Sequence, residues 1–160
     1  MSRRGQMFST DFVASAFVFL VILNIAFFTW NTAYEQQSRF MEEKAMRQEA
    51  FHLASLMVRT PGYPEDWNST NVEIVGLAEP DHVIQDPKVQ EMKDVGYSDL
   101  RAVMGLERTE FFLNVTTPSY SGTVGKPPTG AGDIVVEERA VIVNSSNLFE
   151  RGRLRLLLWN

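Results

Sequence analysis

The chain has 160 residues, a formal net charge of -5 and a sequence pI near 5.1, which suits one globular domain plus a membrane anchor. It contains no cysteine, and this excludes disulfides, thiolate metal sites and a cysteine nucleophile. It shows no basic face of the kind that nucleic-acid binders carry, so we expect no nucleic-acid partner.

The first residues combine a basic pair with a glycine, a short polar stretch and a single carboxylate. They begin Arg3-Arg4-Gly5-Gln6, and Asp11 is the one acidic residue before a long apolar run. A carboxylate at the edge of a membrane span is costly to bury, so its presence favours a functional role with a charged partner nearby. The alternative is that Asp11 lies at the level of the lipid headgroups without a specific role.

An apolar segment extends from Phe12 to Trp30, nineteen residues without a formal charge. At about 1.5 Å rise per residue, a helix of this length spans roughly 28 Å, close to the hydrocarbon thickness of a bilayer. Arg3 and Arg4 precede it, which predicts a single-pass protein in the cell membrane with a cytoplasmic N-terminus and an extracellular C-terminal bulk. The alternatives are a buried core helix and a cleaved secretory signal peptide, although no small-residue cleavage site follows the run.

Residues 31–60 are predicted to continue this helix in amphipathic form. The segment lacks Pro and Gly and is rich in Glu, Gln, Arg, Ala and Met, which are favourable in helices. Its apolar residues recur mostly at spacings of three or four, as on one face of a helix. Thr60-Pro61-Gly62 then breaks the pattern. We therefore expect one helix from about Met7 to Arg59.

Residues 61–160 are predicted to form a β-rich head. The two best strands cover 134–143 and 153–159, and they are expected to pair as an antiparallel hairpin through 144–152. Residues 119–132 are rich in Gly and Pro and are expected to form a long flexible loop.

Shorter elements are expected between the helix and the hairpin. The strands are predicted over 72–77 and 110–117, and a helix over 86–95 begins with Asp86 as its cap. A second short helix, capped by Ser98, is expected through Met104.

These elements indicate an α+β fold in which a small antiparallel sheet packs against the outer half of the long helix. This packing is expected to bury four apolar residues of that half: Phe51, Leu53, Leu56 and Met57.

The stretch from Arg3 to Asp11, together with the apolar segment, resembles the archaeal type IV pilin-like proteins that carry a class III signal peptide. The resemblance implies cleavage by a membrane-bound prepilin peptidase, most simply between Gly5 and Gln6. In the family's usual pattern the acidic residue is the fifth of the mature chain, which Asp11 becomes only after a cut behind Gln6, so both bonds stay open. It also implies that Asp11 pairs with the free N-terminal amine of a neighbouring subunit in a filament core.

The resulting domain assignment has four parts: a leader over 1–6, a membrane-spanning half of the helix over 7–30, an amphipathic half over 31–60 and an extracytoplasmic head over 61–160.

We predict no enzymatic activity, cofactor or metal site. The Gly122 to Lys126 stretch has the wrong spacing for a phosphate-binding loop, and Pro127 follows the lysine. Residues 79–86 contain ligand types for a metal, but we interpret them as a solvated acidic loop. No nucleophile elbow or catalytic triad signature is present.

Three N-glycosylation sequons occur, at Asn68, Asn114 and Asn144. Asn114 lies within a predicted strand and is expected to be the least used of the three.

The sequence therefore favours a structural subunit, major or minor, of an archaeal type IV pilus-like surface filament. Its expected partners are the membrane, a prepilin peptidase and copies of itself or other pilins. The alternative is a single-pass, membrane-tethered binding or accessory protein that does not polymerise.

Overall fold

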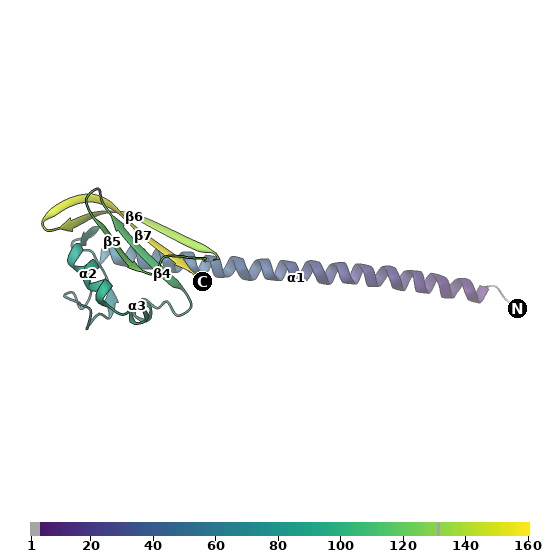
Figure 1. The fold of residues 1–160 in the computed structure, drawn as a ribbon. Coiled ribbons are helices and arrows are strands. Elements are labelled where there is room, and N and C mark those ends of the chain that lie inside the picture. The colour runs from purple at the N-terminus through teal and green to yellow at the C-terminus, as the bar shows by residue number, and fades with distance from the viewer. Residues whose placement is uncertain (1–3, 131) are drawn as a thin grey trace. The chain divides into compact units, whose positions relative to one another are not determined.

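The structure is a computed structural model that describes residues 4–130 and 132–160, with side chains from Thr10 onward. It is α+β, as predicted, with a long N-terminal helix and a β-rich remainder (Figure 1). The chain divides into two compact units, Met1–Glu42 and Glu43–Asn160. We call the second unit the head and describe each unit by itself.

The long helix α1 covers Arg4–Arg59. No Pro or Gly interrupts it after Gly5, so every later backbone N–H can join the helical ladder. The helix ends where predicted, before Pro61. Thr60 closes the last turn, because its backbone N–H and its hydroxyl both donate to the carbonyl of Leu56, at 3.1 and 3.0 Å.

The head contains a five-stranded sheet in the order β3-β6-β7-β4-β5. The strands are β3 (Val83–Gln85), β4 (Glu110–Thr116), β5 (Ser121–Gly125), β6 (Ile134–Ser145) and β7 (Leu148–Trp159). Four of them pair antiparallel, as predicted, but β3 pairs parallel with β6. The sheet is therefore mixed, because β3 reaches β6 through a crossover and not through a hairpin.

The central hairpin of β6 and β7 is longer than predicted. Its pairing continues to Ser145 opposite Leu148, so the connection is a two-residue turn and not the loop expected over 144–152. Ser146 and Asn147 both have positive φ angles, 52° and 65°. Two such residues form the tight turn whose twist matches the flanking strands.

The two short helices form where they were predicted, but their N-caps and one predicted loop differ from the prediction. Helix α2 covers Asp86–Asp94 and α3 covers Tyr97–Val103. Their N-cap positions are Gln85 and Gly96, so the predicted caps Asp86 and Ser98 lie inside the first turns. The predicted flexible loop contains β5, because a run of small residues can pair along the edge of β4.

A two-stranded ribbon follows the long helix and consists of β1 (Gly62–Tyr63) and β2 (Ile74–Val75). The buried indole of Trp67 supports it, since Nε1 donates to the carbonyls of Pro61 and Gly76 at 2.8 and 2.9 Å. Gly62 has φ +94°, and a Cβ there would lie 2.5 Å from Trp67 Nε1. Only glycine fits this position without displacing the indole.

The core of the head lies between the sheet and the last turns of α1. The helix contributes a buried stripe of six residues: Met46, Ala50, Leu53, Ala54, Met57 and Val58. The predicted burial is confirmed for Leu53 and Met57, whereas Leu56 is half-buried. It is wrong for Phe51, which stays 59% exposed and lies under the guanidinium of Arg139, 4.8 Å from the ring centroid.

Candidate functional site

The first candidate site is the apolar part of α1 itself. Within Phe12–Trp30 every side chain is exposed except that of Ala16, which is half-buried. The helix is long and apolar enough to cross a membrane, a property that a signal sequence near an N-terminus shares. A helix that is apolar all round needs an apolar environment, either lipid or other protein.

Most polar groups inside this apolar segment are satisfied by the helix itself. The hydroxyl of Ser15 donates to the carbonyl of Phe12 at 2.9 Å, and that of Thr29 donates to Ile25 at 2.8 Å. Asn24 differs, because its amide makes no hydrogen bond to any residue that the structure describes. It lines a shallow groove on the helix surface with Phe17, Leu20, Val21, Ile25 and Phe28.

The predicted processing and assembly residues lie at the start of α1. Asp11 is exposed, directly before the apolar run, and has no ion pair with a described side chain. Arg4, Gly5 and Gln6 belong to the first helical turns, where side chains are not described, and Arg3 lies outside the described residues. The cleavage bond and the role of Asp11 therefore stay predictions.

The three sequons differ sharply in their surroundings. Asn68 lies in the loop between β1 and β2, and its Oδ1 accepts from the backbone and hydroxyl of Thr70 at 2.9 and 2.7 Å. Asn114 and Asn144 lie within β4 and β6, and each has a buried Oδ1 without a partner. The Nδ2 of Asn144 also donates to Gln85 at 3.0 Å. Asn68 is thus the one sequon outside the five-stranded sheet, and glycosylation at any of the three stays a prediction.

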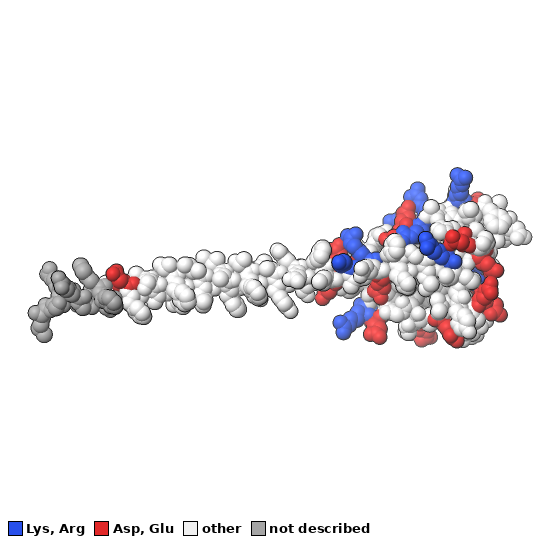
Figure 2. Space-filling view, turned by 180° about the vertical axis from the view of Figure 1, so that it is seen from behind, with Lys and Arg blue, Asp and Glu red and all other residues white. Residues whose placement is uncertain are grey.

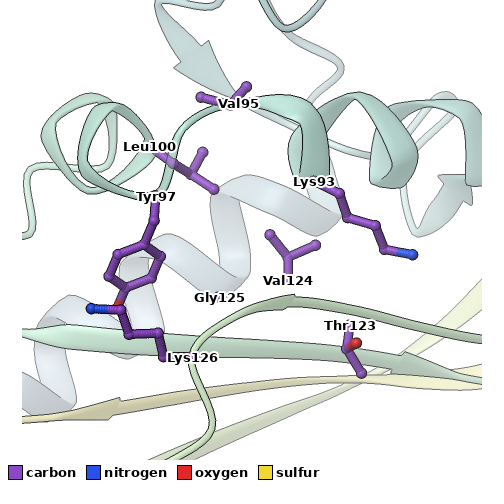
Figure 3. A pocket seen from close by; sticks show the side chains of 8 residues that line it. All are labelled: Lys93, Val95, Tyr97, Leu100, Thr123, Val124, Gly125 and Lys126. Atoms are coloured by element: carbon purple, nitrogen blue, oxygen red, sulfur yellow. The ribbon is translucent and has the colours of Figure 1, made fainter.

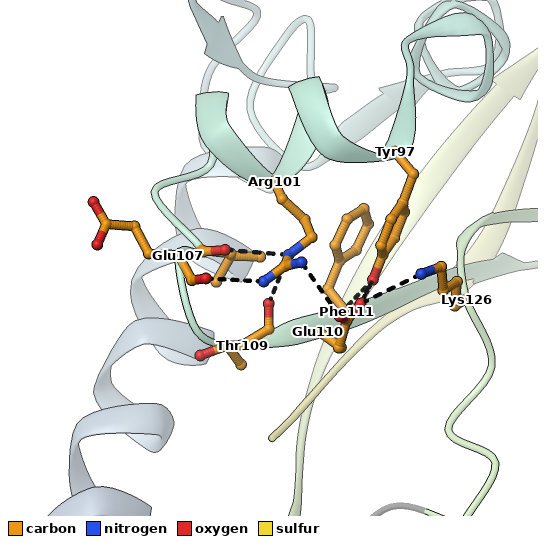
Figure 4. Close-up of polar contacts among 8 residues, drawn as sticks. Tyr97, Arg101, Glu107, Thr109, Glu110, Phe111 and Lys126 are labelled. Carbon is orange, nitrogen blue, oxygen red and sulfur yellow. Dashed lines mark hydrogen bonds and ion pairs between the residues drawn. The ribbon is translucent and has the colours of Figure 1, made fainter.

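A polar network joins α3 to β4 in the head (Figure 4). Arg101 donates to the carbonyls of Leu106, Glu107 and Thr109 at 3.0–3.2 Å, and its Nη1 pairs with Glu110 at 3.2 Å. The Tyr97 hydroxyl donates to the other oxygen of Glu110. Burial, and then the hydrogen bond to Glu110, raise the pKa of Tyr97. This network holds a turn in place, and its donors are used internally.

An open pocket of about 340 Å³ adjoins this network (Figure 3). Val95, Leu100 and Val124 supply its apolar surface. Two lysines line it, and the ammonium of Lys126 lies 4.5 Å from the centroid of the Tyr97 ring, whereas Lys93 donates to Gln90 at 3.2 Å. Lys126 also pairs with Glu110 at 4.0 Å, so Lys93 is the lysine left to meet a small anion with an apolar body. The sequence did not reveal this pocket, because its two lysines come from distant elements.

The acidic loop before α2 forms no metal cluster. Asp81 pairs with Nδ1 of His82 at 2.9 Å, and the described residues contain no group of three or more His, Asp or Glu side chains able to hold a metal ion. The glycine-lysine stretch that was rejected as a phosphate loop is the edge strand β5 and its end.

We find no family model, no curated protein and no solved structure that matches this chain. The functional conclusion therefore rests on the residues and contacts described above.

Proposed function

We propose that this chain is a structural, pilin-like subunit of an archaeal type IV pilus-like surface filament. A prepilin peptidase would cut after Gly5 or after Gln6, and the apolar half of α1 would lie in the membrane until assembly. The observation that carries the proposal is the exposed apolar surface of Phe12–Trp30. Lipid covers such a surface before assembly, and copies of the same helix cover it afterwards.

Two further features support helix-to-helix packing over a permanent solitary anchor. Asn24, in the middle of the apolar segment, carries an amide without a hydrogen-bond partner among the described residues. In an apolar environment this group gains a hydrogen bond when a second helix approaches. Asp11 stands at the end where the new N-terminal amine of a neighbour would provide the opposite charge.

The mature N-terminus tests the proposal directly. Mass spectrometry of the protein from its native membrane should find a start at Gln6 or Met7. A start at Met1 or Ser2 would overturn the pilin-like assignment. A start beyond Trp30 would identify the apolar segment as a conventional signal sequence.

The role of Asp11 has its own test. The Asp11→Ala variant should be processed like the natural chain and yet assemble poorly, since an N-terminal amine would remain uncompensated in the filament core. Pelleting of sheared filaments and N-terminal mass spectrometry measure the two steps separately. Normal assembly by this variant would refute the proposed role.

A membrane-tethered binding protein is the second candidate. The lysine-lined pocket favours it, since a solitary head could hold a small anion there. Purified protein that stays monomeric in membranes after processing would support this function instead.

A further inference from the structure

Within the described residues of the head, no helix covers one side of the five-stranded sheet (Figure 1). On β7 the buried residues Leu154, Leu156 and Leu158 face the core, and the alternate residues point the other way. We define the outer sheet face by the exposed charged and large apolar residues of that side, namely Ile134, Val136, Glu138 and Ile142 on β6, and Phe149, Arg151, Arg153 and Arg155 on β7. Antiparallel sheets commonly leave one side in water, but that side is then mostly polar.

The outer sheet face is both apolar and basic. Phe149 is 62% exposed, and Ile134, Val136 and Ile142 are each exposed by more than a third. Glu138 lies 3.5 Å from Arg153 and 3.4 Å from Arg155, so one carboxylate serves two guanidinium groups. Arg151 has no ion pair with a described residue. Apolar side chains beside arginine are typical of an interface.

The helix-covered side of the same head carries the opposite charge. Residues 65–99 contain nine carboxylates and two lysines. Seven of these carboxylates are exposed: Glu65, Asp66, Glu73, Glu79, Asp81, Asp94 and Asp99. Lys88 lies near Glu65, Asp66 and Glu79 and offsets this charge only in part, because nine carboxylates stand against two lysines. Helices α2 and α3 lie below the sheet in Figure 1, and Figure 2 shows acidic residues along the right edge and underside of the head.

We propose that the outer sheet face of one head docks on the 65–99 side of a second copy. The proposal rests on the proposed filament function and deepens it by naming the contact between heads. Complementary patches on opposite sides of one molecule make a head-to-tail contact, which repeats without closing and so generates an extended array. Charge complementarity also fixes the orientation of the incoming head.

Charge reversal on the full chain tests this contact. The Arg151→Glu/Arg153→Glu variant should lose head contacts, and adding Asp94→Lys/Asp99→Lys to the same chain should restore them. The matched control is Lys44→Glu/Arg108→Glu, which changes the net charge equally at exposed cations outside both the outer sheet face and residues 65–99. Urea unfolding of all variants should match that of the natural chain, because the altered side chains are exposed.

Disulfide cross-linking can measure the head contact, because the natural chain has no cysteine of its own to interfere. Differently tagged copies with Phe149→Cys and Asp81→Cys, co-expressed in membranes, should form a mixed disulfide. Arg151→Glu/Arg153→Glu should lower its yield by about tenfold, since like charges are then opposed. Copies with Phe17→Cys report helix packing independently and should cross-link with or without the charge reversal.

Each outcome separates the two proposals. The contact is supported if Arg151→Glu/Arg153→Glu loses the head cross-link and keeps the helix cross-link. The variant with all four charge reversals should then regain the head cross-link. Two results would overturn the contact and leave the filament function standing. One is a head cross-link whose yield does not change on charge reversal. The other is a missing head cross-link when the helix cross-link forms normally. Absence of both cross-links in the natural background would overturn both. A thiol reagent can also be used to measure the accessibility of Phe149→Cys. If only anionic vesicles protect this cysteine, whatever the protein density, the outer sheet face binds lipid headgroups and the contact is overturned.

Discussion

The two parts of helix α1 share one secondary structure but bury their side chains in opposite ways. Over Phe12–Trp30 the helix is apolar on every side and stays uncovered within its own chain. Between Met46 and Val58 its apolar residues form a stripe that the head covers. The first part therefore depends on other molecules for its burial, whereas the second part is stabilised by the fold of the chain itself.

The largest effect on the stability of the head should come from Met57, and Met41 on the same helix is its control. Met57 is 1% exposed and Met41 is 57% exposed. Met57→Ala should lower the free energy of unfolding of the head by about 2–5 kcal/mol, because it leaves a cavity in the core. Met41→Ala should change it by less than about 0.5 kcal/mol. Urea unfolding followed by circular dichroism in detergent measures both, and equal effects would contradict the contrast between the two parts.

Two tryptophans sharpen the comparison at a smaller scale. Trp67→Phe removes the donor to the carbonyls of Pro61 and Gly76, so the head should lose about 1–3 kcal/mol of stability. The control is Trp30→Phe, since Trp30 is exposed in the apolar part and should leave unfolding of the head unchanged. A neutral Trp67→Phe would show that water replaces the indole without cost.

Asn24 offers a test within the apolar part alone. Asn24→Leu should weaken association of the helices by about 1 kcal/mol, roughly fivefold in the association constant, because one interhelical hydrogen bond is lost. Ser15→Ala is the control, since its hydroxyl is already satisfied by the carbonyl of Phe12. Cross-linking through Phe17→Cys in membranes measures the difference. Stronger association of Asn24→Leu would exclude a pairing role for this amide.

The smallest effect concerns the pH dependence of the head. Hydrogen bonds from the Ser119 and Thr117 hydroxyls hold the pKa of the Glu150 carboxyl below its ordinary value. Its contribution to stability is thus fully present above the ordinary glutamate pKa and is lost as the pH falls through the lower, folded value. The free energy of unfolding should therefore fall on the acid side of its pH profile, which we call the acid limb. Glu150→Gln should make this fall slightly shallower. An unchanged acid limb would show that these hydrogen bonds do not favour the charged form.

Local sequence signals predicted the features that depend on neighbouring residues. The helix and its end follow from the absence of Pro and Gly before Pro61. Within the strand predicted over 153–159, Arg153, Leu154, Arg155 and Leu156 alternate between polar and apolar, and β7 buries the two leucines. Such signals act over one or two turns of the chain, so they can be read without knowing its partners.

Tertiary structure decided the features that depend on distant partners. The strand β3 is three residues long and exists because β6 pairs with it, so no local pattern revealed it. Phe51 fits a helical stripe by spacing, but the head covers the adjoining face of the helix and leaves its ring to Arg139. Asn144 begins an ordinary sequon. In the folded chain β6 pairs with β7, the side-chain oxygen of Asn144 is buried, and its nitrogen donates to Gln85.

The sequence by itself thus determined that the chain has an apolar helix followed by an amphipathic continuation and a β-rich head. Only the tertiary structure decided which side of the sheet stays open and that Glu138 of β6 lies beside Arg153 and Arg155 of β7. The physical reason is that hydrophobic periodicity is a property of consecutive residues, whereas burial and charge complementarity arise between segments that only folding brings together.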